Sequence, residues 1–319
     1  MSPNGRLSMN TAYTRAVSLE RDLAPDAALS PYIPTKRSID TLSRVVRTLG
    51  EDAVPRAWTL VGPYGSGKSA FGVFLARLLS RHGHNKTAAI DALSAVGADD
   101  TWQKSNGSGG YCSGSYCSGG YCSGGYCSGG YCSGGYCAVV LTGSPEPLSR
   151  RLVHALRRAA TDFWAGRRGK PKVLAKIAQA AKRDSVSASE LAGLVDDLCA
   201  AVVRAGCDGL LILIDELGKF LEFEARHFGA NDVFLLQALA ERSAAGGSRR
   251  VLVVTMLHQA FEQYAQGLGE RQRAEWTKVQ GRFEVIPFID ASEQVLKGTS
   301  KNSNFFVSAR KHRAQNRSV

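Results

Sequence analysis

The sequence lacks any long hydrophobic run. None of its apolar segments approaches the roughly 20 residues that a membrane-spanning helix needs. The first ten residues are polar and lack the apolar core of a secretory signal peptide. We therefore expect a cytoplasmic protein that makes no contact with a membrane.

The sequence also lacks the cysteine spacing of a zinc site or a disulfide framework. Six of its eight cysteines lie in residues 107–137, where the unit Ser-Gly-Gly-Tyr-Cys recurs every five residues with one lapse at Ser115. This even C-x₄-C spacing differs from the paired C-x₂-C arrangement of zinc sites. We favour a tandem duplication within a surface loop over a metal or redox cluster. Cys199 and Cys207 are expected to be packed thiols.

Acidic residues are scarce near the end of the chain. The full sequence has 40 Lys and Arg against 28 Asp and Glu, a net charge of +12, and residues 298–319 contain no acid. We interpret 298–319 as a disordered basic tail. Two hypotheses remain open for it: an electrostatic tether for nucleic acid or an anionic surface, or a truncated chain whose native reading frame has been lost.

One specific motif stands against these absences. It matches G-x-x-x-x-G-K-[ST], and its residues are Gly62, Pro63, Tyr64, Gly65, Ser66, Gly67, Lys68 and Ser69. The apolar run 57–61 precedes it like a buried strand, and apolar residues at helical spacing follow it from Phe71 to Leu79. This strand–loop–helix context is the one that a phosphate-binding loop requires.

The residue types of this loop suit a phosphate ligand. Glycines allow successive backbone N–H groups to point at phosphate oxygens, and the helix that begins near Ala70 adds a favourable dipole. We expect Lys68 to contact the β- and γ-phosphates of a nucleotide and Ser69 to hold Mg²⁺. The loop residues through Ala70 are therefore the predicted nucleotide-binding residues.

A second motif lies about 150 residues further along the chain. The apolar run 210–214 ends in Asp215 and Glu216, which is typical of a Walker B strand. In such a site Asp215 binds Mg²⁺ through water and Ser69, and Glu216 orients and polarises the attacking water. The alternative, a strand that ends in a solvated acidic turn, is disfavoured by the presence of the phosphate loop.

Further elements are indicated by hydrophobic periodicity. Strands are expected at 138–142, 250–256 and 283–286, and helices at 172–182, 187–205 and 232–242. Ser38 is expected to cap a helix over 38–49, and Ser144 with Pro145 is expected to start another. Before the first helix, Ile33 and Pro34 are candidates for contact with an adenine base, although an ordinary packing segment explains them equally well.

Other classes of phosphate-loop protein carry signatures that this chain lacks. It has no Asn-Lys-x-Asp for guanine and no Leu-Ser-Gly-Gly-Gln of transporter ATPases. The class that remains has a catalytic Glu after the Walker B Asp and an extra strand between the loop strand and the Walker B strand. With residues 62–69 and 211–216, the chain resembles AAA+ and STAND-like ATPases. Residues 215–222 and 257–264 also resemble the ATPase portion of large bacterial ATP-binding proteins, some of them found in phage defence.

This resemblance implies an α/β fold, a three-layer parallel sheet with helices on both faces, which binds ATP and Mg²⁺ at the carboxyl ends of its strands. It also implies coupling to a homo-oligomer or a larger assembly. A sensor of the γ-phosphate would be Thr255, His258 or Gln259. An arginine finger would come from a neighbouring subunit, and its candidates are Arg271, Arg273 and Arg282. The helical lid of the AAA+ class is not evident before the basic tail.

We thus expect an N-terminal segment at 1–30, an ATPase domain at 31–297 that carries the 107–137 insertion, and the tail at 298–319. The favoured function is Mg-dependent ATP hydrolysis with Lys68 and Glu216 as catalytic residues. One alternative is a nucleotide-dependent switch with little turnover, and another is a nucleic-acid-binding module that uses the tail and the basic loop at 167–172.

Overall fold

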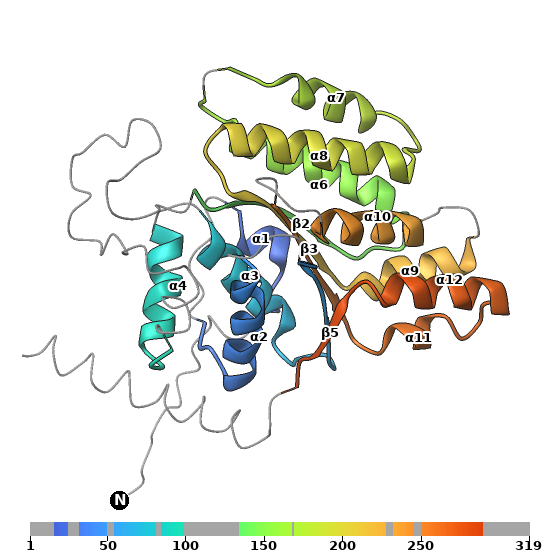
Figure 1. Ribbon diagram of the computed structural model, residues 1–319, viewed down its shortest axis with the longest axis horizontal. Coiled ribbons are helices and arrows are strands. Elements are labelled where there is room, and N and C mark those ends of the chain that lie inside the picture. The colour runs from blue at the N-terminus through green and yellow to red at the C-terminus, as the bar shows by residue number, and fades with distance from the viewer. Residues whose placement is uncertain are drawn as a thin grey trace, which may run out of the picture.

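A single parallel β-sheet organises the chain (Figure 1). The computed structural model describes residues 16–24, 32–49, 54–80, 84–98, 134–167, 169–227, 232–244 and 250–289. The strands are β1 (Ala57–Val61), β2 (Tyr136–Thr142), β3 (Gly209–Asp215), β4 (Arg250–Leu257) and β5 (Glu284–Pro287), in the order β2-β3-β4-β1-β5. β4 lies between β1, which precedes the loop at 62–69, and β3, which ends in Asp215, and this order confirms the predicted extra strand.

Helices cover both faces of this sheet, as predicted (Figure 1). One face packs against α1 (Leu19–Asp22), α2 (Lys36–Arg47), α3 (Lys68–Leu79) and α4 (His84–Ser94). The other side holds α6 (Leu148–Phe163), α7 (Lys172–Ala180), α8 (Ala188–Arg204), α9 (Leu217–Arg226), α10 (Asp232–Ala244), α11 (Phe261–Tyr264) and α12 (Glu270–Gln280). The fold class is therefore a three-layer α/β architecture.

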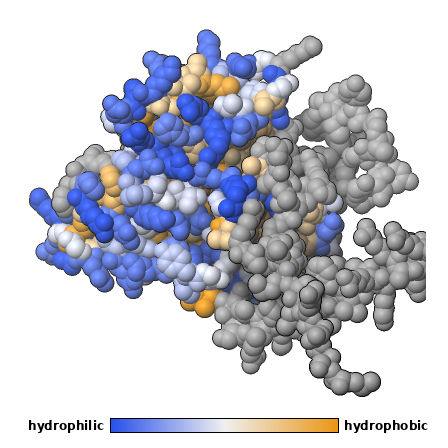
Figure 2. All heavy atoms as spheres, turned by 180° about the vertical axis from the view of Figure 1, so that it is seen from behind, coloured by the Kyte–Doolittle hydropathy of each residue, from blue (hydrophilic) through white to orange (hydrophobic). Residues whose placement is uncertain are grey.

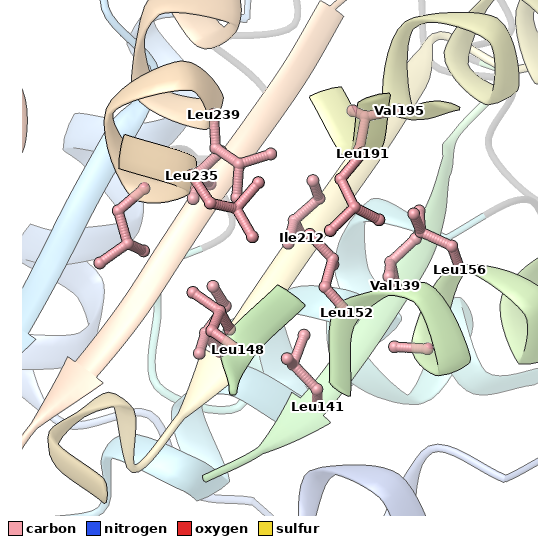
Figure 3. Packing of buried hydrophobic residues seen from close by; sticks show 14 of the residues in the cluster. Val139, Leu141, Leu148, Leu152, Leu156, Leu191, Val195, Ile212, Leu235 and Leu239 are labelled. Atoms are coloured by element: carbon pink, nitrogen blue, oxygen red, sulfur yellow. The ribbon is translucent and has the colours of Figure 1, made fainter. Parts of the chain in front are cut away.

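The central strand β3 shows why the strands are continuously apolar. All seven of its residues are buried. Side chains alternate between the two faces of a strand, so Leu210 and Ile212 belong to the core under α6–α12, while Leu211 and Leu213 belong to the core under α1–α4. Figure 3 shows Ile212 among apolar side chains of α6, α8 and β2.

Two helix starts differ from the sequence prediction. Thr35, not Ser38, caps α2, because the Thr35 hydroxyl accepts a hydrogen bond from the Ser38 amide at 3.3 Å. α6 begins at Leu148 instead of Ser144. Its first amides donate to the carboxylate of Asp232, at 3.0 Å from the Ser149 nitrogen, so a residue from the start of α10 caps this helix.

β2 also begins earlier than predicted, inside the last copy of the five-residue repeat. Tyr136 and Cys137 are buried in this strand. Gly135 has a φ of +67°, and a Cβ at Gly134 would collide with the backbone oxygen of Gly206. The last repeat copy is therefore a fitted part of the sheet, whereas residues 101–133 lie outside the described part of the chain.

The short helix α1 closes the outer edge of β2. Leu19 is fully buried, and the Glu20 carboxylate accepts a hydrogen bond from the Thr142 amide at 2.9 Å. Glu20 also pairs with Arg151 and Arg158, each at 2.7 Å. Residues 16–24 thus share the core of the main fold. The domain boundaries drawn from the sequence stay predictions, and the tail at 298–319 lies outside the described residues.

Hydrophilic side chains dominate the coloured atoms in Figure 2, with smaller apolar areas between them. Among the described helices, none combines the length and the apolar character that crossing a membrane would require.

Candidate nucleotide-binding site

The two motifs predicted from the sequence meet at the carboxyl ends of the parallel strands. The loop at 62–69 joins β1 to α3, and Asp215 and Glu216 join β3 to α9. β4 ends between these two turns. The Gly62 amide donates to the carbonyl of Leu257 at 3.1 Å, which ties the start of the loop to the end of β4.

Glycine is required at three places in the loop for two different reasons. Gly65 and Gly67 have φ values of +77° and +88°, a left-handed conformation that side chains disfavour. No atom of the described residues lies within 4 Å of a Cβ built on either one, so these residues do not restrict the space there. At Gly62, by contrast, a Cβ would collide with the backbone oxygen of Phe288. The loop is therefore shaped by backbone conformation, with room left at its turn for a ligand.

Lys68 is buried at the base of this loop. Its ammonium donates hydrogen bonds to the carbonyls of Gly62 at 2.6 Å and Pro63 at 2.8 Å, and to the Ser66 hydroxyl at 3.2 Å. Burial lowers the pKa of Lys68, and the nearby Asp215 carboxylate opposes this shift. The loop therefore holds the ammonium of Lys68 in place. Lys68 is the residue for which the sequence predicts contact with phosphate.

The predicted metal-binding pair is brought together. The Asp215 carboxylate accepts a hydrogen bond from the Glu216 amide at 2.9 Å, and the side chain of Ser69 lies beside it. Burial raises the pKa of Asp215, and its interactions with Ser69 and with the Glu216 amide oppose the rise. A hydroxyl and a carboxylate are oxygen ligands of the kind that Mg²⁺ takes, with water and phosphate completing its shell. These two residues fit the ion.

Glu216 adopts an unusual backbone conformation. With a φ of +50°, it alone among the non-glycine residues that the structure describes has a positive φ. Its carboxylate accepts a hydrogen bond from Lys219 at 2.5 Å, and its other oxygen lies 3.9 Å from Nε2 of His258. Lys219 was not among the candidate site residues predicted from the sequence. Its position three residues after Glu216 could have indicated the contact, since side chains three residues apart are neighbours at a helix start.

The three candidates for a γ-phosphate sensor lie in different surroundings. Thr255 is fully buried and its hydroxyl lies 2.9 Å from the Thr59 hydroxyl inside the sheet. Gln259 is exposed. His258 faces the loop: its ring stacks on Tyr64 with a centroid distance of 3.5 Å.

His258 has hydrogen-bonding capacity that the described residues leave unused. Both ring nitrogens are buried without a hydrogen-bond partner among them. Burial lowers the pKa of His258, and the charge of Lys68 lowers it further, so the ring is neutral at pH 7. Buried polar groups normally have a partner. The free nitrogens of His258 therefore point to a ligand or an ordered water in this site.

The other candidate residues show no feature among the described residues that tests their predicted roles. Arg282 pairs with Glu241 at 3.2 Å, and Arg271 and Arg273 are exposed on α12. Pro34 is buried and Ile33 is partly exposed. Neither shows an interaction that would mark a base-binding residue, so their contact with adenine stays a prediction.

Comparison with known proteins adds little to this geometry. No protein-family model and no curated protein matches the chain. Among solved structures, the chain is similar to the Orc1 protein of Aeropyrum pernix, solved in complex with DNA, with 14% identity and a TM-score of 0.37. The match covers 88% of this chain and 52% of that protein, so the chain spans about half its length. A similarity this weak carries no conclusion about function.

Proposed function

We propose that this chain binds MgATP at the loop 62–69 and hydrolyses the bond between its β- and γ-phosphates. One observation carries the proposal: Lys68 and Ser69 from the first motif share a site with Asp215 and Glu216 from the second. Chance could produce either motif alone, but the parallel sheet assembles all four side chains at one edge. The cytoplasmic location proposed from the sequence is consistent with an ATP-dependent activity.

The binding step follows from the loop geometry. Backbone amides at the start of α3 and the ammonium of Lys68 provide positive charge for the triphosphate. On binding, Lys68 exchanges its contacts with the loop carbonyls for phosphate oxygens. Ser69 and Asp215 would hold Mg²⁺, which when bound supplies charge neutralisation across the β- and γ-phosphates.

The hydrolytic step needs a base and a donor. Glu216 accepts a hydrogen bond from water, orients its oxygen toward the γ-phosphorus and takes the proton as the new P–O bond forms. The bond between the γ-phosphorus and the bridging oxygen breaks, and ADP leaves with the electron pair. Neutral His258 has an N–H that can donate to a γ-phosphate oxygen or to the water.

The first experiment measures MgATP binding and phosphate release for the wild type, Lys68→Ala and Glu216→Gln. We expect Lys68→Ala to lose most of its affinity, since a buried cation is removed from the phosphate site. Glu216→Gln should bind MgATP normally, and its rate of phosphate release should fall by a factor of about 100 or more. Thermal unfolding of each variant checks that the fold is retained. A wild type that binds no nucleotide would refute the proposal.

One structural observation favours the alternative of a nucleotide-dependent switch. The carboxylate of Glu216, the proposed base, is paired with Lys219, and the expected arginine finger would have to come from a neighbouring subunit. Full turnover would then wait for a partner or a second copy of the chain. Binding of MgATP with negligible phosphate release, restored by an added partner, distinguishes this alternative from an intrinsically active ATPase.

The proposed contact with nucleic acid would use the tail at 298–319, which lies outside the described residues, and the basic loop at 167–172, where Arg167 lies over the ring of Phe163 at 4.0 Å. It stays a proposal with its own test. Affinity for DNA or RNA should fall steeply with salt and disappear when residues 298–319 are deleted.

A further inference from the structure

The proposed site has a deficit of positive charge. A triphosphate keeps a negative charge after one Mg²⁺ binds, and Asp215 and Glu216 add two carboxylates. Lys68 and the N-terminus of α3 offset only part of this total. Charge that develops on a transferring phosphoryl group needs preorganised cations nearby. A second positive side chain at the mouth of the loop would supply what is missing.

Lys219 is a cation in the right place. Its ammonium donates to Glu216 at 2.5 Å, and its side chain is 47% exposed, so it remains accessible to a ligand. The pKa of Lys219 is raised, first by this hydrogen bond and further by Tyr64 and Asp215. Lys219 in turn contributes to the lowered pKa of His258. These electrostatic effects indicate that the ammonium of Lys219 lies near Tyr64 of the loop, near the carboxylates of Asp215 and Glu216, and near the ring of His258.

Helix stability does not explain a lysine at this position. Lys219 lies in the first turn of α9, and this turn contains no acidic residue. The positive end of the helix dipole disfavours a cation there. A lysine in the first turn is understandable if its partner is an anion beyond the helix end. Glu216 is one such anion, and the γ-phosphate is the other that the site is built to receive.

We infer that Lys219 is a catalytic residue of this ATPase, which contacts the γ-phosphate in cis when MgATP is bound. The inference rests on the proposed function. Lys219 exchanges Glu216 for a γ-phosphate oxygen and thereby frees the carboxylate of Glu216 to accept the proton of the attacking water. Lys219 keeps its own proton throughout and neutralises the charge that grows on the phosphoryl oxygens.

The chain offers a matched control for this lysine. Lys278 on α12 pairs with Glu275 at 2.7 Å, again three residues apart, and is exposed. We compare Lys219→Met, Lys219→Arg and Lys278→Met with the wild type. The measurements are kcat and KM for phosphate release, and the equilibrium affinities for MgADP and for a non-hydrolysable MgATP analogue.

Lys219→Met should lower kcat about 100-fold, the size seen when one charge-stabilising donor is removed. It should also weaken binding of the MgATP analogue about 10-fold, roughly the effect of one charge-assisted hydrogen bond, and leave MgADP affinity unchanged. Lys219→Arg should retain most of the wild-type kcat and most of the wild-type affinity for the MgATP analogue. Lys278→Met should match the wild type, because its ion pair lies on an exposed helix face.

Three results would overturn the inference. An unchanged or higher kcat in Lys219→Met would mean that Lys219 only restrains Glu216. Equal losses of MgADP and MgATP-analogue affinity would mean that Lys219 does not recognise the γ-phosphate. A wild type that binds neither nucleotide would overturn the proposed function together with this inference. The ratio of the two affinities decides the question even if the isolated chain turns over slowly.

Discussion

Two turns at the same edge of the sheet begin their helices in the same way with different residues. The residue before α3 is Gly67, with φ +88° and ψ 8°. The residue before α9 is Glu216, with φ +50° and ψ 42°. Both are left-handed, so strand and helix are joined by a similar local bend in each motif. At the first position the residue is glycine, which suits the left-handed conformation best, and at the second it is glutamate, which suits it poorly.

The difference fits the role that we propose for each turn. In the proposed site the backbone at Gly67 binds the phosphates, and glycine adopts the left-handed conformation without strain. At Glu216 the proposed role belongs to the side chain, and the left-handed backbone costs about 1–2 kcal/mol. Close packing holds this strained residue, since a Cβ at Gly143 would collide with the Glu216 carbonyl. Local strain at a residue whose carboxylate pairs with Lys219 beside the loop is consistent with a role in chemistry.

The largest effect expected from this comparison is that of Gly67→Ala. The built Cβ meets no atom within 4 Å, so only the left-handed φ resists the substitution. We expect a loss of about 1–2 kcal/mol of unfolding free energy and a marked loss of MgATP affinity as the loop relaxes. Urea unfolding and nucleotide titration measure the two effects.

Gly193→Ala on α8 is the matched control, because its Cβ also meets nothing and its φ is not positive. It should stabilise the fold by about 0.5–1 kcal/mol. Equal effects of the two substitutions would show that the left-handed conformation of Gly67 is not needed.

A smaller effect is expected from comparing Glu216→Gly with Glu216→Ala. Both remove the carboxylate and its pairing with Lys219, but only glycine relieves the backbone strain. After allowing for the greater freedom of glycine in the unfolded chain, the glycine variant should be more stable by about 0.5–1 kcal/mol. Thermal and urea unfolding of the two variants measure this difference. A more stable alanine variant would contradict the assignment of strain to Glu216.

The smallest effect is the pH dependence that His258 contributes. Its folded pKa lies below the ordinary value of about 6.5, so the unfolded chain binds the proton more readily. Stability is therefore highest above pH 6.5 and falls as the pH drops through that value toward the folded pKa. The loss of melting temperature between pH 7.5 and pH 5.5 should be smaller in His258→Gln than in the wild type. His154, whose pKa is also lowered, acts equally in both proteins.

Local patterns predicted most of this fold. The loop 62–69 and the strand that ends at Asp215 were readable because their residues are consecutive. The five strands and the position of β4 between β1 and β3 followed from apolar runs and from the class of motif. Thr255 and His258 could not be separated, because the choice depends on which side chain faces Thr59 inside the sheet and which faces the loop.

The features that escaped prediction depend on contacts between distant residues. Asp232 caps α6 from more than 80 residues away, so no local signal placed the start of that helix. Asp208 accepts hydrogen bonds from the amides of Gly134 and Gly135, and this contact fits the end of the repeat to β2. A five-residue period that matches neither helix nor strand concealed a strand within its final copy.

In the final copy of the repeat, the structure constrains which residues are present and does not depend on how many copies precede it. Gly134, Gly135, Tyr136 and Cys137 each have a structural requirement at the entry to β2. Every complete upstream copy ends in the same Tyr-Cys pair. Gain or loss of whole units therefore leaves the residues directly before Ala138 unchanged, and the chain can lengthen or shorten by five residues per unit without altering the strand. A frameshift within the repeat would instead change the strand itself.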